Sequence, residues 1–99
     1  MSLNVAVDRV QLAAFCKRNG IRRLAVFGSV LRDDFAPHSD IDVLVEFEPG
    51  RTPGLAFFAM PDELSRLFHR VVDLHTPASL SRYFRDRVLA EAEDQYVAA

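Results

Sequence analysis

The sequence contains a single cysteine, Cys16, which is too few for a disulfide-rich domain or a cysteine zinc site. It contains no tryptophan. One cysteine forms no internal disulfide and has no second thiol for a zinc site, so we expect Cys16 to pack in the core. No stretch reaches the roughly 18 apolar residues that span a bilayer, and the first residues lack the features of a signal peptide. We therefore expect no membrane association and a cytoplasmic location.

Lysine is nearly missing, since eleven of the twelve basic residues are arginines and only Lys17 is a lysine. The arginines are spread along the chain and do not gather into the basic stripe of a nucleic-acid-binding protein. Direct binding of nucleic acid is therefore not expected. Internal repeats and low-complexity segments are absent as well, which excludes a solenoid or a disordered tail.

The 99 residues suffice for one compact domain, and we treat residues 1 to 99 as a single unit. The net charge of −2 hides a strong imbalance along the chain. Residues 24 to 48 contain one basic and six acidic residues, a net charge of −5. Crowded carboxylates repel one another unless a cation joins them, so this stretch is the first candidate for a binding site.

The first half of the chain predicts a helix followed by two strands. Apolar residues recur at helical spacing from Val7 and stop at Asn19-Gly20, a typical helix end. The apolar run from residue 21 to residue 27 indicates a buried strand that leads directly into Gly28. Asp40 then opens a strand with one apolar face and one face that begins with carboxylates; the apolar positions are Ile41, Val43, Val45 and Phe47.

The second half predicts helix, strand and helix. Residues 55 to 68 carry a helical apolar stripe in which Pro61 must kink the helix or start a second one. Residues 71 to 75 form a short strand with Asp73 in its middle, and Thr76-Pro77 is suited to begin a final helical region that contains Leu80, Phe84, Val88 and Ala92. Strands separated by helices predict a small α/β (α+β) domain, a sheet with helices packed on it.

Three carboxylates are the strongest candidates for chemistry. Asp40 and Asp42 lie two residues apart on one strand and project from the same face. If the strand of Asp73 pairs beside theirs, the three carboxylates form a cluster that can hold two metal ions for phosphoryl transfer. Ligands that are all oxygen favour Mg²⁺, with Mn²⁺ as an alternative.

Gly28-Ser29 offers the complementary half of such a site. A glycine at a strand-to-helix turn lets a phosphate approach the backbone, and Ser29 adds a hydroxyl donor. Arg32 is placed to reach a phosphate oxygen, although an ion pair with a neighbouring aspartate is an equal alternative. A phosphate cradle next to a metal cluster suits a metal-bound nucleoside triphosphate.

These residues carry a resemblance to a known family. Gly28-Ser29, followed after ten residues by Asp40-Ile41-Asp42, with Arg32 and Ser39 between them and Val72-Asp73-Leu74 downstream, resembles the DNA polymerase beta superfamily of nucleotidyltransferases. The similarity is strongest to its minimal nucleotidyltransferase (MNT) branch, whose members act as antitoxins beside HEPN ribonuclease toxins. The resemblance implies a small mixed sheet of the polymerase-beta-like nucleotidyltransferase fold.

The resemblance also implies residue roles and a reaction. Asp40 and Asp42 would bind two Mg²⁺ ions, and Asp73 would bind the catalytic ion and help deprotonate the acceptor. Gly28 and Ser29 would hold the β- and γ-phosphates of ATP. Arg32 and Ser39 are further candidates for nucleotide binding, and an alternative role for Ser39 is to order its loop. AMP would pass to a hydroxyl, in these pairs a tyrosine of the HEPN toxin, in a cytoplasmic toxin-antitoxin system.

Alternatives remain open at this point. The chain could neutralise its partner by contact as a non-catalytic nucleotide-binding antitoxin, or it could modify a small molecule or an RNA end. We predict packing roles for Tyr83 and Tyr96. His75 shares a strand face with Asp73, so lining the pocket is one alternative for it, and the resemblance assigns it no role.

Overall fold

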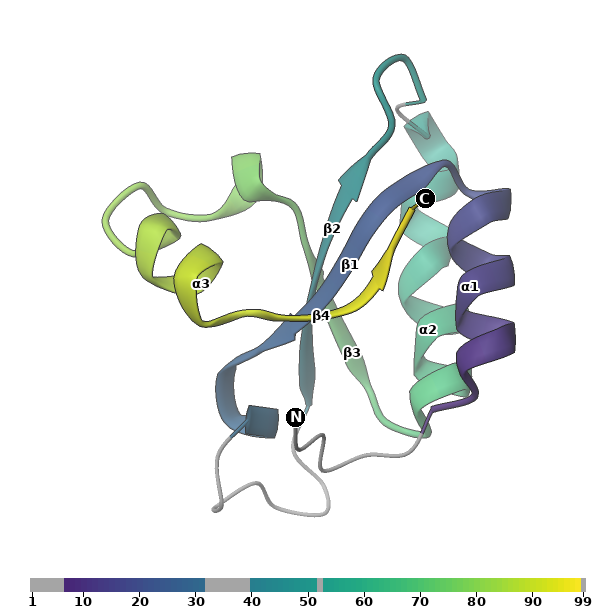
Figure 1. Cartoon of the computed structure of the whole chain (residues 1–99), viewed down its shortest axis with the longest axis horizontal. Helices are drawn as coiled ribbons and strands as arrows, with labels where there is room; N and C mark the ends of the chain where they lie inside the picture. Colours follow the sequence, from purple (N-terminus) through teal and green to yellow (C-terminus); the bar gives the residue numbers. More distant parts are fainter. Residues whose placement is uncertain (1–6, 32–39, 52, 99) are drawn as a thin grey trace.

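The computed structural model describes residues 7–31, 40–51 and 53–98. Its centre is a four-stranded sheet with the order β3-β2-β1-β4 (Figure 1). Strands β1 and β2 are antiparallel, as are β1 and β4, whereas β2 and β3 run parallel. The mixed sheet confirms the predicted fold class. In chain order the elements are α1 (Arg9–Arg18), β1 (Ile21–Phe27), the 3₁₀ turn η1 (Gly28–Leu31), β2 (Ile41–Phe47), η2 (Gly54–Ala59), α2 (Met60–Phe68), β3 (Val72–His75), η3 (Pro77–Ser79), α3 (Arg85–Glu91) and β4 (Glu93–Val97).

The main core lies between one face of the sheet and the helices α1 and α2, which stand together on that side (Figure 1). Alternation along β2 places Ile41, Val43 and Val45 in this core, as the sequence pattern predicts. Cys16 is fully buried here, which confirms its packing role. Helix α1 begins where the carboxylate of Asp8 accepts hydrogen bonds from two free backbone N–H groups, and it ends at Asn19.

The opposite face of the sheet is covered only in part. A smaller cluster of Phe27, Leu44, Leu80 and Val88 joins it to the segment that holds η3 and α3. Figure 1 shows α3 on the far side of the sheet from α1 and α2. Asp42 and Glu46 of β2 lie on this less covered face, because they alternate with the core residues of the strand.

Most predicted elements are present, but the C-terminal third differs from the prediction. Pro61 starts a second helix after η2, one of the two outcomes expected for it. The final helix is shorter than predicted, because Leu80 is extended and α3 begins only at Arg85. Strand β4 follows it, and the sequence analysis missed this strand. None of the described helices is long and apolar enough to cross a membrane.

The two tyrosines have different environments. Tyr96 on β4 packs against the main core, which confirms the expectation for it. Tyr83 is 86% exposed, so the predicted packing role was wrong for this residue. Its segment lies just before α3, where the chain covers the smaller cluster with Leu80 and leaves the intervening side chains outside.

Candidate active site

Two carboxylates face each other across the parallel strands. Asp42 of β2 and Asp73 of β3 are direct partners in the ladder between these strands. Directly paired residues project from the same face of a sheet, on strands about 4.8 Å apart. This pairing confirms that the strand of Asp73 lies beside the strand of Asp42. Both carboxylates lie on the face of the sheet that points away from the main core.

His75 joins this pair, and the sequence analysis left its role open. Its Nε2 lies 3.5 Å from Oδ1 of Asp42 and 3.4 Å from Oδ2 of Asp73. These separations are longer than a well-formed hydrogen bond, so the contact is electrostatic. Among the described residues, Asp42, Asp73 and His75 are the group whose ligand atoms come together within 4.8 Å. The signal that could have found it is spacing, because residues 73 and 75 share a face of their strand.

Gly28 closes one side of the cluster. It follows Phe27, the ladder partner of Asp42, and its φ of +81° is a left-handed value that favours glycine. A Cβ atom at this position would lie 2.5 Å from Oδ2 of Asp42, which is closer than packed atoms approach. The glycine therefore permits both the turn into η1 and the contact of this turn with the carboxylate.

The electrostatics of Asp42 reflect its position. Burial raises the pKa of Asp42 above its ordinary value, and the negative charges of Asp73 and Asp40 raise it further. His75 lowers the same pKa, and the net direction is upward. A carboxylate held among other carboxylates is stabilised by a bound cation, so the arrangement favours a metal ion or another cation at this point.

The other predicted site residues differ in how close the structure places them to the carboxylates. Asp40 is exposed just before β2, near enough for its charge to act on Asp42, but it does not belong to the three-residue group. Ser29 is partly buried in η1 directly after Gly28. Arg32 and Ser39 lie outside the described residues. The structure thus brings Gly28, Asp42 and Asp73 together and adds His75 to them.

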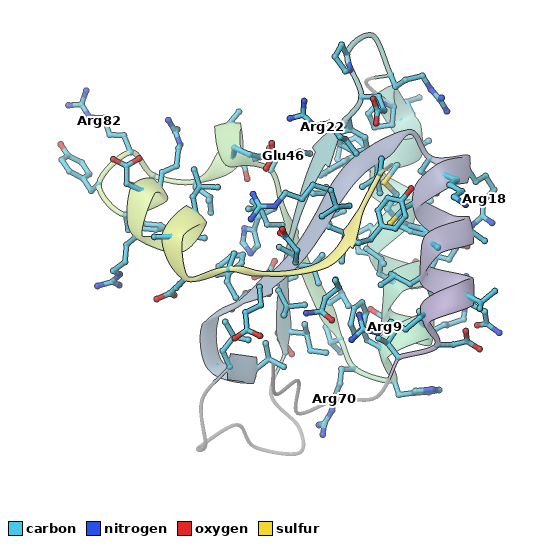
Figure 2. The ribbon with its side chains drawn as sticks, viewed as in Figure 1. Arg9, Arg18, Arg22, Glu46, Arg70 and Arg82 are labelled. Carbon is cyan, nitrogen blue, oxygen red and sulfur yellow. The ribbon has the colours of Figure 1, made fainter. Side chains whose placement is uncertain are left out.

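A second charged group on the same face has a structural role. Glu46 accepts hydrogen bonds from Arg22 at 3.0 Å and from Arg23 at 2.8 Å. Arg22 and Glu46 are labelled in Figure 2. Arg23 also pairs with Asp94, so the network joins β2, β1 and β4. The hydrogen bond from Arg23 is the main cause that lowers the pKa of Glu46 below its ordinary value. Glu46 is therefore occupied by arginines and is not a metal ligand.

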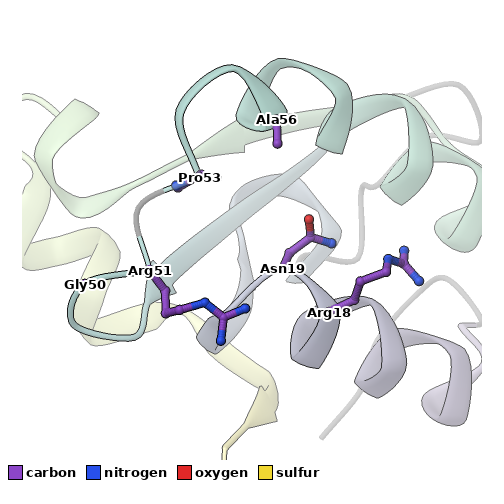
Figure 3. Close-up of a pocket in the computed structure, with 6 residues that line it drawn as sticks. All are labelled: Arg18, Asn19, Gly50, Arg51, Pro53 and Ala56. Carbon is purple, nitrogen blue, oxygen red and sulfur yellow. The ribbon is translucent and has the colours of Figure 1, made fainter.

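Two hollows lie away from the carboxylates. One of about 270 Å³ is lined by residues at the end of α1 and in the loop after β2 (Figure 3); these are Arg18, Asn19, Gly50, Arg51, Pro53 and Ala56. The other, of about 260 Å³, is apolar and is lined by Phe47, Pro53, Gly54, Phe57, Phe58 and Thr76. Neither contains Gly28, Asp42 or Asp73, and their linings lack paired carboxylates. The chemistry of the side chains places the active-site candidate at the carboxylates.

Comparison with known proteins identifies the family of the chain. A model of the nucleotidyltransferase domain matches residues 9–96. A protein of Methanocaldococcus jannaschii that is provisionally named a protein adenylyltransferase is 32% identical over 92 residues, which cover 93% of this chain and 98% of the relative. The protein adenylyltransferase MntA of Thermococcus cleftensis is 37% identical over 76 residues, 76% of this chain and 75% of that protein.

Solved structures show the same fold. One described provisionally as a minimal nucleotidyltransferase superposes with a TM-score of 0.70 at 38% identity and covers 86% of both chains. A chain of a toxin-antitoxin complex with AMP-PNP gives a TM-score of 0.71 at 18% identity, over 93% of this chain and 75% of that chain, a likeness of fold alone. The chain belongs to the nucleotidyltransferase domain family, in its minimal nucleotidyltransferase branch, and is a nucleotidyltransferase.

Proposed function

We propose that the chain transfers AMP from ATP to a tyrosine hydroxyl of a HEPN ribonuclease toxin in the cytoplasm and thereby acts as the antitoxin of that toxin. The observation that carries this proposal is the placement of Asp42 opposite Asp73, with Gly28 packed against Asp42. Relatives named as protein adenylyltransferases and the toxin-antitoxin complexes of the same fold support it.

The donor set suits a divalent metal. Asp42 and Asp73 offer paired oxygens, and Asp40 adds negative charge beside them. We propose that these three aspartates hold two Mg²⁺ ions, with Mn²⁺ as an alternative. Such ions would neutralise the charge that develops during phosphoryl transfer.

The protein groups bind the nucleotide and orient the acceptor. We propose that the turn at Gly28 and the hydroxyl of Ser29 bind phosphate beside Asp42, with Arg32 and Ser39 as further phosphate ligands. The acceptor oxygen forms a bond to the α-phosphorus while the bond to the leaving pyrophosphate breaks. The carboxylate of Asp73 takes the proton of the acceptor hydroxyl.

The position of Asp73 fits an acceptor that arrives on another protein. Strand β3 is an edge of the sheet, and the side chain of Asp73 is 60% exposed, against 31% for Asp42. A large acceptor can therefore approach the site from the side of Asp73 without a change of fold. The more enclosed Asp42 and Gly28 lie on the side where the nucleotide is proposed to bind.

Protection of cells tests the proposal. The chain and the HEPN toxin proposed as its partner are co-expressed, and growth is compared for the wild type, Asp42→Asn and the matched control Asp86→Asn, an exposed aspartate of α3. We expect the wild type and Asp86→Asn to restore growth and Asp42→Asn to fail while it still folds. Full protection by Asp42→Asn would instead favour an antitoxin that acts by contact alone.

A further inference from the structure

We propose that His75 supplies a nitrogen ligand to the metal ion held by Asp42 and Asp73, so that this site binds Mn²⁺ more tightly relative to Mg²⁺ than a site of carboxylates alone would. The inference rests on the proposed function, which places the metal at these aspartates. It assigns to His75 a part in selecting the metal.

The distances match those between ligands of one ion. Two ligand atoms that each lie about 2.1 Å from a metal at a tetrahedral angle are about 3.4 Å apart, and at a right angle about 3 Å. Nε2 of His75 lies 3.5 Å from Asp42 and 3.4 Å from Asp73. One ion can therefore contact the imidazole and both carboxylates with small adjustments of the side chains.

The imidazole has a nitrogen to offer. Nε2 of His75 is shielded from solvent and has no hydrogen-bond partner among the described residues. A buried polar atom without a partner is costly, and a bound cation would remove that cost. The ring is held in place by Phe27, whose ring centre lies 5.3 Å away, and by strand β3. The nitrogen is therefore held at the cluster before any metal binds.

The chemistry of the donor set decides the metal preference. Oxygen ligands suit Mg²⁺, which demands near-octahedral geometry and keeps several waters. Imidazole nitrogen suits transition metals better than it suits Mg²⁺, whose ligands in proteins are oxygens. Replacement of the imidazole by an amide oxygen should therefore move the preference towards Mg²⁺.

Binding of Mn²⁺ alone, without nucleotide or acceptor, tests the assignment. Pulsed electron paramagnetic resonance detects the modulation that a directly bound nitrogen imposes on Mn²⁺, and isotopic labelling of histidine identifies its source. We expect this modulation in the wild type and its loss in His75→Gln. The ratio of Mn²⁺ affinity to Mg²⁺ affinity should also fall at least about tenfold in His75→Gln.

The control is His69→Asn, since His69 ends α2 in a left-handed conformation that asparagine tolerates. This variant should keep both the modulation and the affinity ratio. The role of His75 would be overturned if the wild type showed no nitrogen modulation although Asp42→Asn weakened Mn²⁺ binding. The aspartate site would remain supported in that case. Mn²⁺ binding that Asp42→Asn does not weaken would overturn both, because the ion would then lie elsewhere.

Discussion

Asp42 and Asp73 face each other as direct partners in the parallel ladder between β2 and β3, and Gly28 packs against the carboxylate of Asp42. The fold thereby holds together like charges that would repel in an open chain. Such an arrangement is costly without a cation and favourable with one. The predictions below follow from this relationship and from the packing around it.

Asp42→Asn should keep or raise the free energy of unfolding of the metal-free protein and should abolish its stabilisation by MgATP. Without metal, the variant should be as stable as the wild type or more so, because it removes a partly buried charge from a crowded cluster. At a concentration one hundred times Kd, MgATP should stabilise the wild type by about 2.7 kcal/mol. This corresponds to a rise in Tm of roughly 10 °C for a chain of this size.

Thermal unfolding with and without MgATP measures both effects, with Asp86→Asn as the control that should respond like the wild type. An equal rise of Tm in Asp42→Asn would remove Asp42 from the nucleotide and metal site.

Gly28→Ala should cost more stability than Gly50→Ala. Both glycines have φ near +80°, so both substitutions introduce similar backbone strain of about 1 kcal/mol. A Cβ at residue 28 also meets Asp42, whereas nothing lies within 4 Å of one at residue 50. This contact should add about 1–3 kcal/mol. Urea denaturation compares the two variants, and equal losses would contradict the close approach of Gly28 to Asp42.

Glu46→Gln should lower stability in a pH-dependent way. Its arginine partners hold the pKa of Glu46 below the ordinary value of 4.5, so the native state favours the charged carboxylate. The stabilisation is present above pH 4.5 and is lost as the pH falls through the lower native pKa. We expect Glu46→Gln to cost about 1 kcal/mol at pH 7.

The difference in unfolding free energy between wild type and Glu46→Gln should begin to shrink below pH 4.5 and approach zero once the pH lies below the lowered native pKa of Glu46. The exposed Glu91→Gln of α3 is the control and should show no such trend. A difference that stays constant between pH 7 and pH 3 would contradict the ion-pair network.

Cys16 should be inert towards thiol reagents in the native protein. It is fully buried, and burial raises the pKa of its thiol to about 12. At pH 8 about one molecule in ten thousand would carry the reactive thiolate, even before access is considered. Labelling with a disulfide reagent should therefore proceed only at the rate of unfolding and become rapid in denaturant. Fast labelling without denaturant would contradict the packing of α1 against the sheet.

Much of the fold could be predicted from local patterns. The alternation in β2 and the apolar run of β1 are strong because both strands are central and one face is buried by α1 and α2. Strand β4 has no such pattern. Its residues Glu93–Val97 form an edge strand with no fully buried side chain, so only the pairing with β1 makes it a strand.

The candidate site was predicted in part. Asp42, Asp73 and Gly28 were identified because residue type, strand spacing and turn chemistry point to the same place. The contact of His75 depends on the parallel register, which pairs residue 42 with residue 73 and residue 44 with residue 75. The spacing of residues 73 and 75 places His75 on the face of Asp73, but its contact with Asp42 follows only from the packing of β2 beside β3.

Direct transfer of AMP tests the central claim. The purified chain is incubated with the HEPN toxin proposed as its partner, ATP and Mg²⁺, and the intact mass of each protein is measured before peptides locate any modification. We predict that the HEPN protein gains the mass of AMP on a tyrosine with the wild type and with Asp86→Asn, and gains none with Asp42→Asn or Asp73→Asn. An unmodified partner with the wild type, or equal modification with Asp42→Asn, would contradict the account.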